Sequence, residues 1–191
     1  MIFIVKHNAD GTFSHVFAAN PGGIGDYDLR SPNDLIIPYD FDHSGKLDHL
    51  VLYRPGSGVI FIVKHNADGT FSRVFAANPG GIGGYDLRSP NDLIIPYDFD
   101  HSGKLDHLVL YRPGGGVIFI VKHDADGSFT RVYTANPGGI GGFDLQSPSD
   151  RIILYDFDHS GKTDYLALYR PGAGIVVIMR NQGGVFTPVY P

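Results

Sequence analysis

Short apolar segments alternate with turn residues along the whole chain, and the pattern repeats every 58 residues. Within one repeat, residues 49–54 place Leu50 and Leu52 on one face of a strand and Val51 and Tyr53 on the other. Residues 59–64 are apolar on both faces, which is typical of a strand buried on both sides. With residues 34–41 and 71–77, these segments predict four short antiparallel strands per repeat.

The repeats are nearly identical at first and diverge later. Residues 1–58 and 59–116 differ at four positions, residues 117–174 are a more diverged copy, and residues 175–191 begin a fourth. A polar, glycine-rich connection such as residues 78–91 separates the strand groups. Four antiparallel strands with one crossing connection are the unit of a β-propeller. A β-trefoil has shorter units without an acidic loop, and a stack of parallel coils uses shorter repeats.

We therefore expect an all-β protein with residues 1–191 in a single repeat domain. It should contain three full propeller blades and a half-blade hairpin at residues 1–20. The 26 glycines, 13 prolines and 13% aromatic residues agree with an all-β chain rich in turns. A net charge of −5 without a basic block argues against a nucleic-acid partner. The chain has no cysteine and no apolar run of membrane-spanning length, and Met1 leads directly into repeat sequence, which predicts no signal peptide.

An acidic loop recurs at residues 40–48, 98–106 and 156–164. Each copy has aspartates at positions 1, 3 and 9, a serine at position 5 and a glycine at position 6. In a tight turn, alternate side chains point inward and present their oxygens to one centre, and the backbone carbonyl of position 7 can add another. This pattern predicts a site for a hard cation, and calcium tolerates such irregular coordination. The serine, and the lack of a glutamate at position 12, predict weak binding of roughly 10⁻⁴–10⁻³ M, as in extracellular modules. The alternative is a turn in which the aspartates cap their own backbone.

Residues 40–58, which read Asp-Phe-Asp-His-Ser-Gly-Lys-Leu-Asp-His-Leu-Val-Leu-Tyr-Arg-Pro-Gly-Ser-Gly, resemble the FG-GAP repeat, also called the VCBS or integrin-α-like repeat. The resemblance covers three full copies and implies a propeller that holds calcium between the first and second strands of each blade. Functions in that family are mostly recognition, as in adhesins, lectins and toxin-complex propellers. The implied ligands are Asp40, Asp42, Ser44, the Lys46 carbonyl and Asp48; Asp98, Asp100, Ser102, the Lys104 carbonyl and Asp106; and Asp156, Asp158, Ser160, the Lys162 carbonyl and Asp164.

The long connections predict a second kind of site. An aromatic ring beside a carboxylate and a polar side chain can recognise sugars, because the ring packs on C–H faces and the polar groups take hydroxyls. The alternative is that the ring fills the gap between blades. The residues concerned are Tyr27, Asp28 and Arg30; Tyr85, Asp86 and Arg88; and Phe143, Asp144 and Gln146.

Two functions follow from these patterns. The first is a calcium-binding, lectin-like propeller that binds carbohydrate through repeated equivalent sites. The second is a structural or protein-interaction propeller, such as an adhesin or toxin-complex fragment or an engineered repeat protein. Because no nucleophile paired with a base recurs, we expect a protein that is not an enzyme.

The histidines and the blade count give the last expectations. Position 4 of each acidic loop is a histidine, which should point away from the bound cation into solvent; these are His43, His101 and His159. Since three blades do not close a ring, exposed apolar flanks and sheet edges predict a homodimer.

Overall fold

The computed structural model describes residues 2–19, 22–77 and 79–191. These residues form strands and turns only. Among them, no helix is long and apolar enough to cross a membrane.

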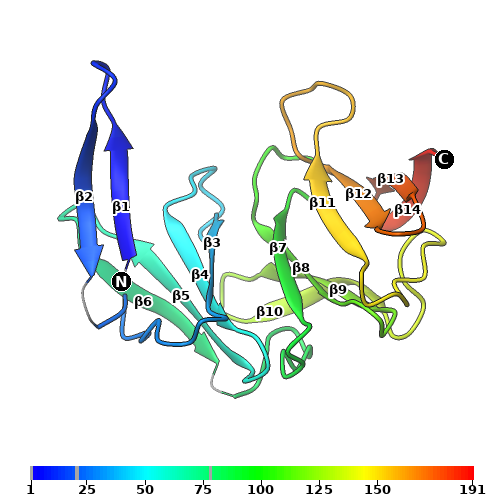
Figure 1. Cartoon of the computed structure of the whole chain (residues 1–191), viewed down its shortest axis with the longest axis horizontal. Helices are drawn as coiled ribbons and strands as arrows, with labels where there is room; N and C mark the ends of the chain where they lie inside the picture. The colour runs from blue at the N-terminus through cyan, green and yellow to red at the C-terminus, as the bar shows by residue number, and fades with distance from the viewer. Residues whose placement is uncertain (1, 20–21, 78) are drawn as a thin grey trace.

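A hairpin and three four-stranded antiparallel sheets follow one another along the chain (Figure 1). The hairpin pairs β1 (Ile2–His7) with β2 (Phe13–Ala19). The first sheet has the order β3 (Leu35–Tyr39), β4 (His49–Arg54), β5 (Val59–His65) and β6 (Phe71–Ala77). The second has β7 (Leu93–Tyr97), β8 (His107–Arg112), β9 (Val117–His123) and β10 (Phe129–Ala135). The third has β11 (Arg151–Tyr155), β12 (Tyr165–Arg170), β13 (Ile175–Gln182) and β14 (Val185–Tyr190).

This arrangement confirms the predicted fold, an all-β chain of propeller-type blades with four antiparallel strands each. The predicted strand 34–41 is shorter at both ends in the structure, because the Asp34 carboxylate accepts from the Ser31 amide in the connection and Asp40 and Phe41 already belong to the acidic loop. The predicted half-blade is the β1–β2 hairpin, which corresponds to the outer strands β5 and β6 of a full blade.

The first strand of each sheet lies on the inner side of the arrangement. Adjacent sheets contact one another through β3, β7 and β11, which lie side by side in Figure 1. β3 pairs with β4 alone, so Pro38 within it removes no ladder hydrogen bond on its open side. The acidic loops then lie at one end of the sheets, at the top of Figure 1, and the long connections at the other.

The hydrophobic core consists of layers between neighbouring sheets. One layer joins the first and second sheets through Val51, Ile62 and Leu108, and another joins the second and third through Val109, Ile120 and Leu166. The long connections add apolar pairs to these layers. Ile82 and Tyr85, from the connection before β7, lie in the layer between the first and second sheets. The layers hold the sheets, and with them the loops at both ends, in fixed relative positions.

Candidate functional site

The first aspartate of each acidic loop organises the loop backbone. Asp40 is buried, and its Oδ1 and Oδ2 accept hydrogen bonds from the amides of Ser44 (2.9 Å) and Gly45 (2.7 Å). Asp98 and Asp156 do the same in their loops. Gly45 has φ +82°, which favours glycine at this bend. The self-capping turn considered as an alternative is therefore present for these three aspartates, and the predicted calcium ligation stays a prediction.

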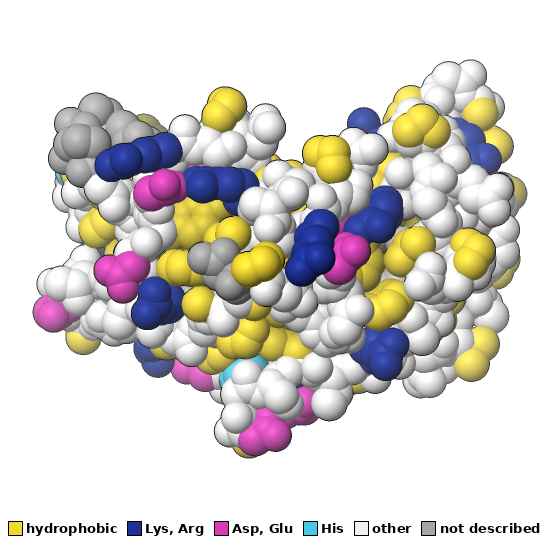
Figure 2. Space-filling model, turned by 90° about the horizontal axis from the view of Figure 1, so that it is seen from below, with side chains coloured by type: hydrophobic (Ala, Val, Ile, Leu, Met, Phe, Trp, Pro, Cys, Tyr) yellow, Lys and Arg dark blue, Asp and Glu magenta, His cyan; other side chains and the backbone are white. Residues whose placement is uncertain are grey.

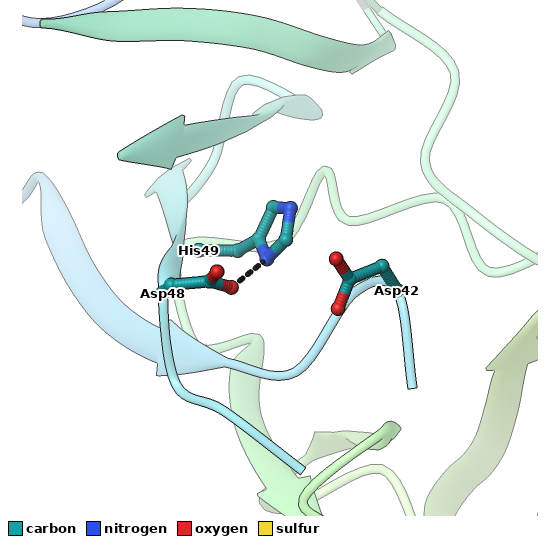
Figure 3. A group of neighbouring side chains, drawn as sticks. All are labelled: Asp42, Asp48 and His49. Carbon is teal, nitrogen blue, oxygen red and sulfur yellow. Dashed lines mark ion pairs between the residues drawn. The ribbon is translucent and has the colours of Figure 1, made fainter. Parts of the chain in front are cut away.

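The third and ninth residues of the first loop meet at a histidine (Figure 3). Ligand atoms of Asp42, Asp48 and His49 all lie within 4.8 Å of one another, and Asp100, Asp106 and His107 form the same group in the second sheet. His49 Nδ1 lies 2.7 Å from Asp48 Oδ1. The two carboxylates suit calcium, and together with the imidazole they suit a first-row divalent ion. His49 flanks the acidic loop in the sequence, but it was not predicted as a ligand because Tyr165 stands at its position in the third repeat.

Electrostatics favour an ionised Asp42 and a neutral His49. Partial burial opposes the charge of Asp42, but hydrogen bonds from Ser44 and Lys64 outweigh it and lower the pKa of Asp42 to about 2. Burial lowers the pKa of His49, because the charged ring would lose its hydration. A cation here would have to displace the Lys64 ammonium, which lies 3.3 Å from Asp42 Oδ2.

Two of the position-4 histidines, His43 and His101, hold neighbouring sheets together. His43 Nδ1 lies 2.7 Å from Asp106 Oδ2 in the next sheet, and its Nε2 lies 2.9 Å from the His123 carbonyl oxygen. The Lys104 ammonium donates to the His43 carbonyl at 2.7 Å. The Tyr39 hydroxyl donates to the Asp106 carbonyl at 2.7 Å. We call this set of contacts the inter-blade latch; the expectation that the position-4 histidines point into solvent is wrong for His43 and His101, whereas His159 in the third loop is exposed.

The latch recurs between the second and third sheets. His101 Nδ1 lies 2.6 Å from Asp164 Oδ2, and Nε2 lies 2.8 Å from the Asn181 carbonyl oxygen. Both ring nitrogens face acceptors, an arrangement that only the doubly protonated ring satisfies. Desolvation opposes that charge, but these two hydrogen bonds outweigh it and raise the pKa of His101.

The latch decides which loop is free to bind a cation. In the second loop both carboxylate oxygens of Asp106 are engaged. His107 Nδ1 lies 2.7 Å from Oδ1, and His43 Nδ1 lies 2.7 Å from Oδ2. Asp164 has His101 on one oxygen, and Tyr165 replaces the adjacent histidine. Within the described residues, Asp48 receives no such contact from a preceding sheet. The first loop therefore offers the best donor set of the three predicted sites.

In the long connections the predicted sugar-stacking rings are buried. Tyr27 and Tyr85 are 3% exposed and Phe143 is 7% exposed, so their faces cannot serve as stacking platforms. The Tyr27 hydroxyl donates to Asp34 Oδ1 at 2.9 Å. The alternative considered from the sequence, packing between blades, describes these rings correctly.

An arginine from the Tyr-Arg-Pro segment fixes each connection. Arg112 donates from Nε and Nη2 to the two oxygens of Asp92 at 2.7 and 2.9 Å, and from Nη2 to Asp86 at 2.6 Å. Its guanidinium also lies 5.6 Å from the centre of the Tyr85 ring. Arg54 and Arg170 make the same contacts with Asp34 and Asp28 and with Asp150 and Asp144.

Arg30, Arg88 and Gln146 play a smaller part than the sequence predicted. Their backbone amides donate to Asp28, Asp86 and Asp144, and their side chains are exposed.

A hollow nevertheless opens beside two of these ion pairs. In the third sheet it measures about 370 Å³ and is lined by Phe143, Asp144, Arg170, Ile175 and Val177. The second sheet has a hollow of about 140 Å³ at the equivalent residues Tyr85, Asp86, Arg112, Val117 and Phe119. Figure 2 shows this end of the molecule, with acidic and basic side chains next to one another over apolar surface.

Glycine keeps the connections close to the strands. A Cβ on Gly83 would lie 2.5 Å from the Val121 side chain, and Gly83 has φ +56°. The predicted carboxylates Asp86 and Asp144 thus do lie beside an apolar wall, but the guanidinium next to each comes from Arg112 or Arg170, which were not among the predicted site residues.

No protein-family model matches the sequence. No curated protein matches it either. Among solved structures, a protein from Lactobacillus plantarum is similar over 98% of this chain and 50% of its own, with 16% identity and a TM-score of 0.52. A protein of Bacteroides fragilis named as a candidate 6-phosphogluconolactonase has 14% identity and a TM-score of 0.49 over 97% of this chain and 52% of its own. The periplasmic gluconolactonase of Pseudomonas aeruginosa has 15% identity and a TM-score of 0.45 over 98% and 49%.

These comparisons correct two expectations. The resemblance to FG-GAP repeats is wrong, because no family model matches the sequence. The prediction of a protein that is not an enzyme is also wrong as an inference from this fold, since gluconolactonases are enzymes. The chain spans about half the length of these solved structures. At such low identity the comparison shows the fold alone, and the chain has a β-propeller type of architecture.

Proposed function

We propose that the chain is a carbohydrate-binding propeller module that takes a sugar in the hollow beside Asp144 and Arg170. The observation that carries the proposal is the recurrence of this hollow at equivalent residues of two sheets. A carboxylate and a guanidinium supply an acceptor and donors for hydroxyl groups, and Ile175 and Val177 supply an apolar wall for C–H faces.

The third sheet is the better of the two sites. Its volume of about 370 Å³ lies within the roughly 300–1,000 Å³ typical of small-molecule pockets, and the hollow of about 140 Å³ does not. The Gln146 amide and Arg170 hydrogen-bond Asp144 and lower the pKa of its carboxyl, so it stays an ionised acceptor. Binding at a single site of this kind should be weak and should gain avidity when several copies are displayed together.

Retention of the chain on a panel of immobilised glycans tests the proposal. Asp144→Ala should reduce retention at least tenfold, since it removes a charged hydrogen-bond acceptor. Asp126→Ala is the matched control, because Asp126 is an exposed carboxylate at the tip of the β9–β10 hairpin, which lies at the acidic-loop end of the sheets. If the parent chain retains no glycan, or if Asp144→Ala retains as much as the parent, carbohydrate binding in this hollow is excluded.

We further propose that the first acidic loop takes a divalent cation, with Asp42 and Asp48 as ligands. Calcium would use the oxygens predicted from the sequence, and a first-row ion would add His49. A cation that binds only the folded state raises the thermal midpoint. That rise should disappear in Asp42→Asn and persist in Asp158→Asn, its counterpart in the third loop.

The two kinds of ion can be separated in the same experiment. A larger rise with Mn²⁺ than with Ca²⁺ supports His49 as a ligand, and a larger rise with Ca²⁺ supports the oxygen set. No rise with either ion at millimolar concentration would contradict the proposed cation site.

A further inference from the structure

The inner edge of β1 is a strand edge without a partner. β5, β9 and β13 each pair on both sides, whereas β1 pairs with β2 alone within the described residues. Residues 2–7 of β1 are identical in sequence to residues 60–65, of which residues 60–64 pair with β4. An open edge with the sequence of a central strand is a template for a further strand.

Beside this edge the chain has an apolar groove of about 320 Å³. Its walls include Ile4 and Phe17 from the hairpin, Leu50 from β4 and Leu47 from the first acidic loop. The residues of the second repeat that correspond to Leu47 and Leu50 are covered by the inner strands of the first sheet. Ile36 is 39% exposed where Ile94 is 6% exposed, and Leu50 is partly exposed where Leu108 is buried.

The groove also presents half of an inter-blade latch. Asp48 lines the groove and occupies the position of Asp106, which receives His43 from the preceding sheet. His65 also lines it and corresponds to His123, whose carbonyl accepts from the same histidine. Lys46 is exposed, whereas its counterpart Lys104 donates to the His43 carbonyl. The groove thus carries the groups that would receive a latch histidine from another sheet.

We propose that this groove binds a two-stranded β-hairpin of the inner-strand type, presented in trans and similar to residues 34–54 of this chain. Its second strand would pair with β1 as β4 pairs with β5. Its tyrosine and histidine, the counterparts of Tyr39 and His43, would donate to the Asp48 carbonyl and carboxylate. The groove accepts two strands and no more, because β1 and β2 already occupy the position of the outer pair. A complete blade from a second copy would bring β13 and β14 into that same position.

The test uses a fluorescent synthetic peptide of residues 34–54 and the full chain, with binding followed by anisotropy. Saturable binding to one site per chain is expected. A His43→Ala peptide should bind at least tenfold more weakly because it lacks the charged hydrogen bond. A Val51→Pro peptide should not bind, because proline removes a ladder donor and clashes within the pairing strand.

Two variants of the chain localise the contact. Lys46→Ala should weaken peptide binding severalfold and leave the thermal midpoint of the free chain unchanged. Lys104→Ala should lower the midpoint and leave the peptide affinity unchanged, because its latch lies between the first and second sheets. Equal binding of the parent and Val51→Pro peptides would overturn the proposal, as would a self-associated chain that the peptide fails to dissociate.

A fusion covers the case in which the free peptide does not fold. Residues 34–58 placed directly before residue 1 match the junction between Gly58 and Val59 except that Met1 replaces the valine, and so offer β1 its partner in cis. The fusion should raise the thermal midpoint by several degrees and protect the amides of residues 2–7 from exchange. A fusion with an unchanged midpoint and unprotected β1 amides would also overturn the proposal.

Discussion

The hairpin β1–β2 and the outer strands β5–β6 have almost the same sequence and very different surroundings. Residues 2–14 and 60–72 are identical, and both pairs have the same register and the same irregularity. Val63 is 0% exposed and Val5 is 48% exposed. In this protein the strand sequence fixes the hairpin, whereas neighbouring strands and connections decide what becomes core.

The largest expected effect comes from matched truncations of the two hairpins. Ile62→Ala should lower the free energy of unfolding by about 2–5 kcal/mol, because Ile62 is fully buried between two sheets. Ile4→Ala should cost less than half as much, since Ile4 is only partly buried. Denaturant unfolding measures both, and equal losses would mean that the two hairpins have equivalent surroundings in solution.

A second matched pair concerns the latch, which the β1–β2 hairpin cannot form because it lacks the inner strands. Asp106→Asn should cost about 1–3 kcal/mol, since it weakens hydrogen bonds from two histidines to a buried carboxylate. Asp48→Asn, measured with a chelator present, should cost less than about 1 kcal/mol because Asp48 has no latch. Chemical denaturation of the two variants decides between them, and a larger loss for Asp48→Asn would contradict this account of the latch.

The smallest effect is a pH dependence with a definite sign. His101 has a raised pKa in the folded chain, so its contribution to stability is fully present below the ordinary histidine pKa of about 6.5. It is lost as pH rises through the raised value. Parent and His101→Gln should therefore differ most below pH 6.5 and converge in alkaline solution. His159→Gln, which affects an exposed loop histidine, is the control and should change the curve little. A His101→Gln difference that grows as pH rises would contradict the latch.

Local sequence patterns predicted the blades well and their contacts poorly. Alternation in residues 49–54 and the double-sided apolar run after residue 59 identify strands, because strand formation and turn chemistry are local. The Asp-to-glycine spacing likewise identifies the acidic loop. Pairing of His43 with Asp106 joins residues 63 apart, and no local pattern encodes it.

The connection shows the same limit. Tyr85 beside Asp86 is a sugar-binding pattern on a surface and a packing pattern in an interface, and only the neighbouring sheet decides which applies. Arg112, the partner that binds Asp86, comes from β8, the second strand after the connection. The recurrence of Tyr-Arg-Pro in every repeat was the available signal for it. The predicted homodimer stays a prediction.

Hydrogen exchange at β1 tests most directly whether this hairpin is an unfinished blade. A fragment of residues 1–7 differs in mass from residues 59–65 and 117–123, which are identical to each other, because Met1 replaces valine. The account predicts that β1 amides facing away from β2 exchange quickly, while the fragments from β5 and β9 are protected throughout. Equal protection of all three strands in the free chain would contradict it.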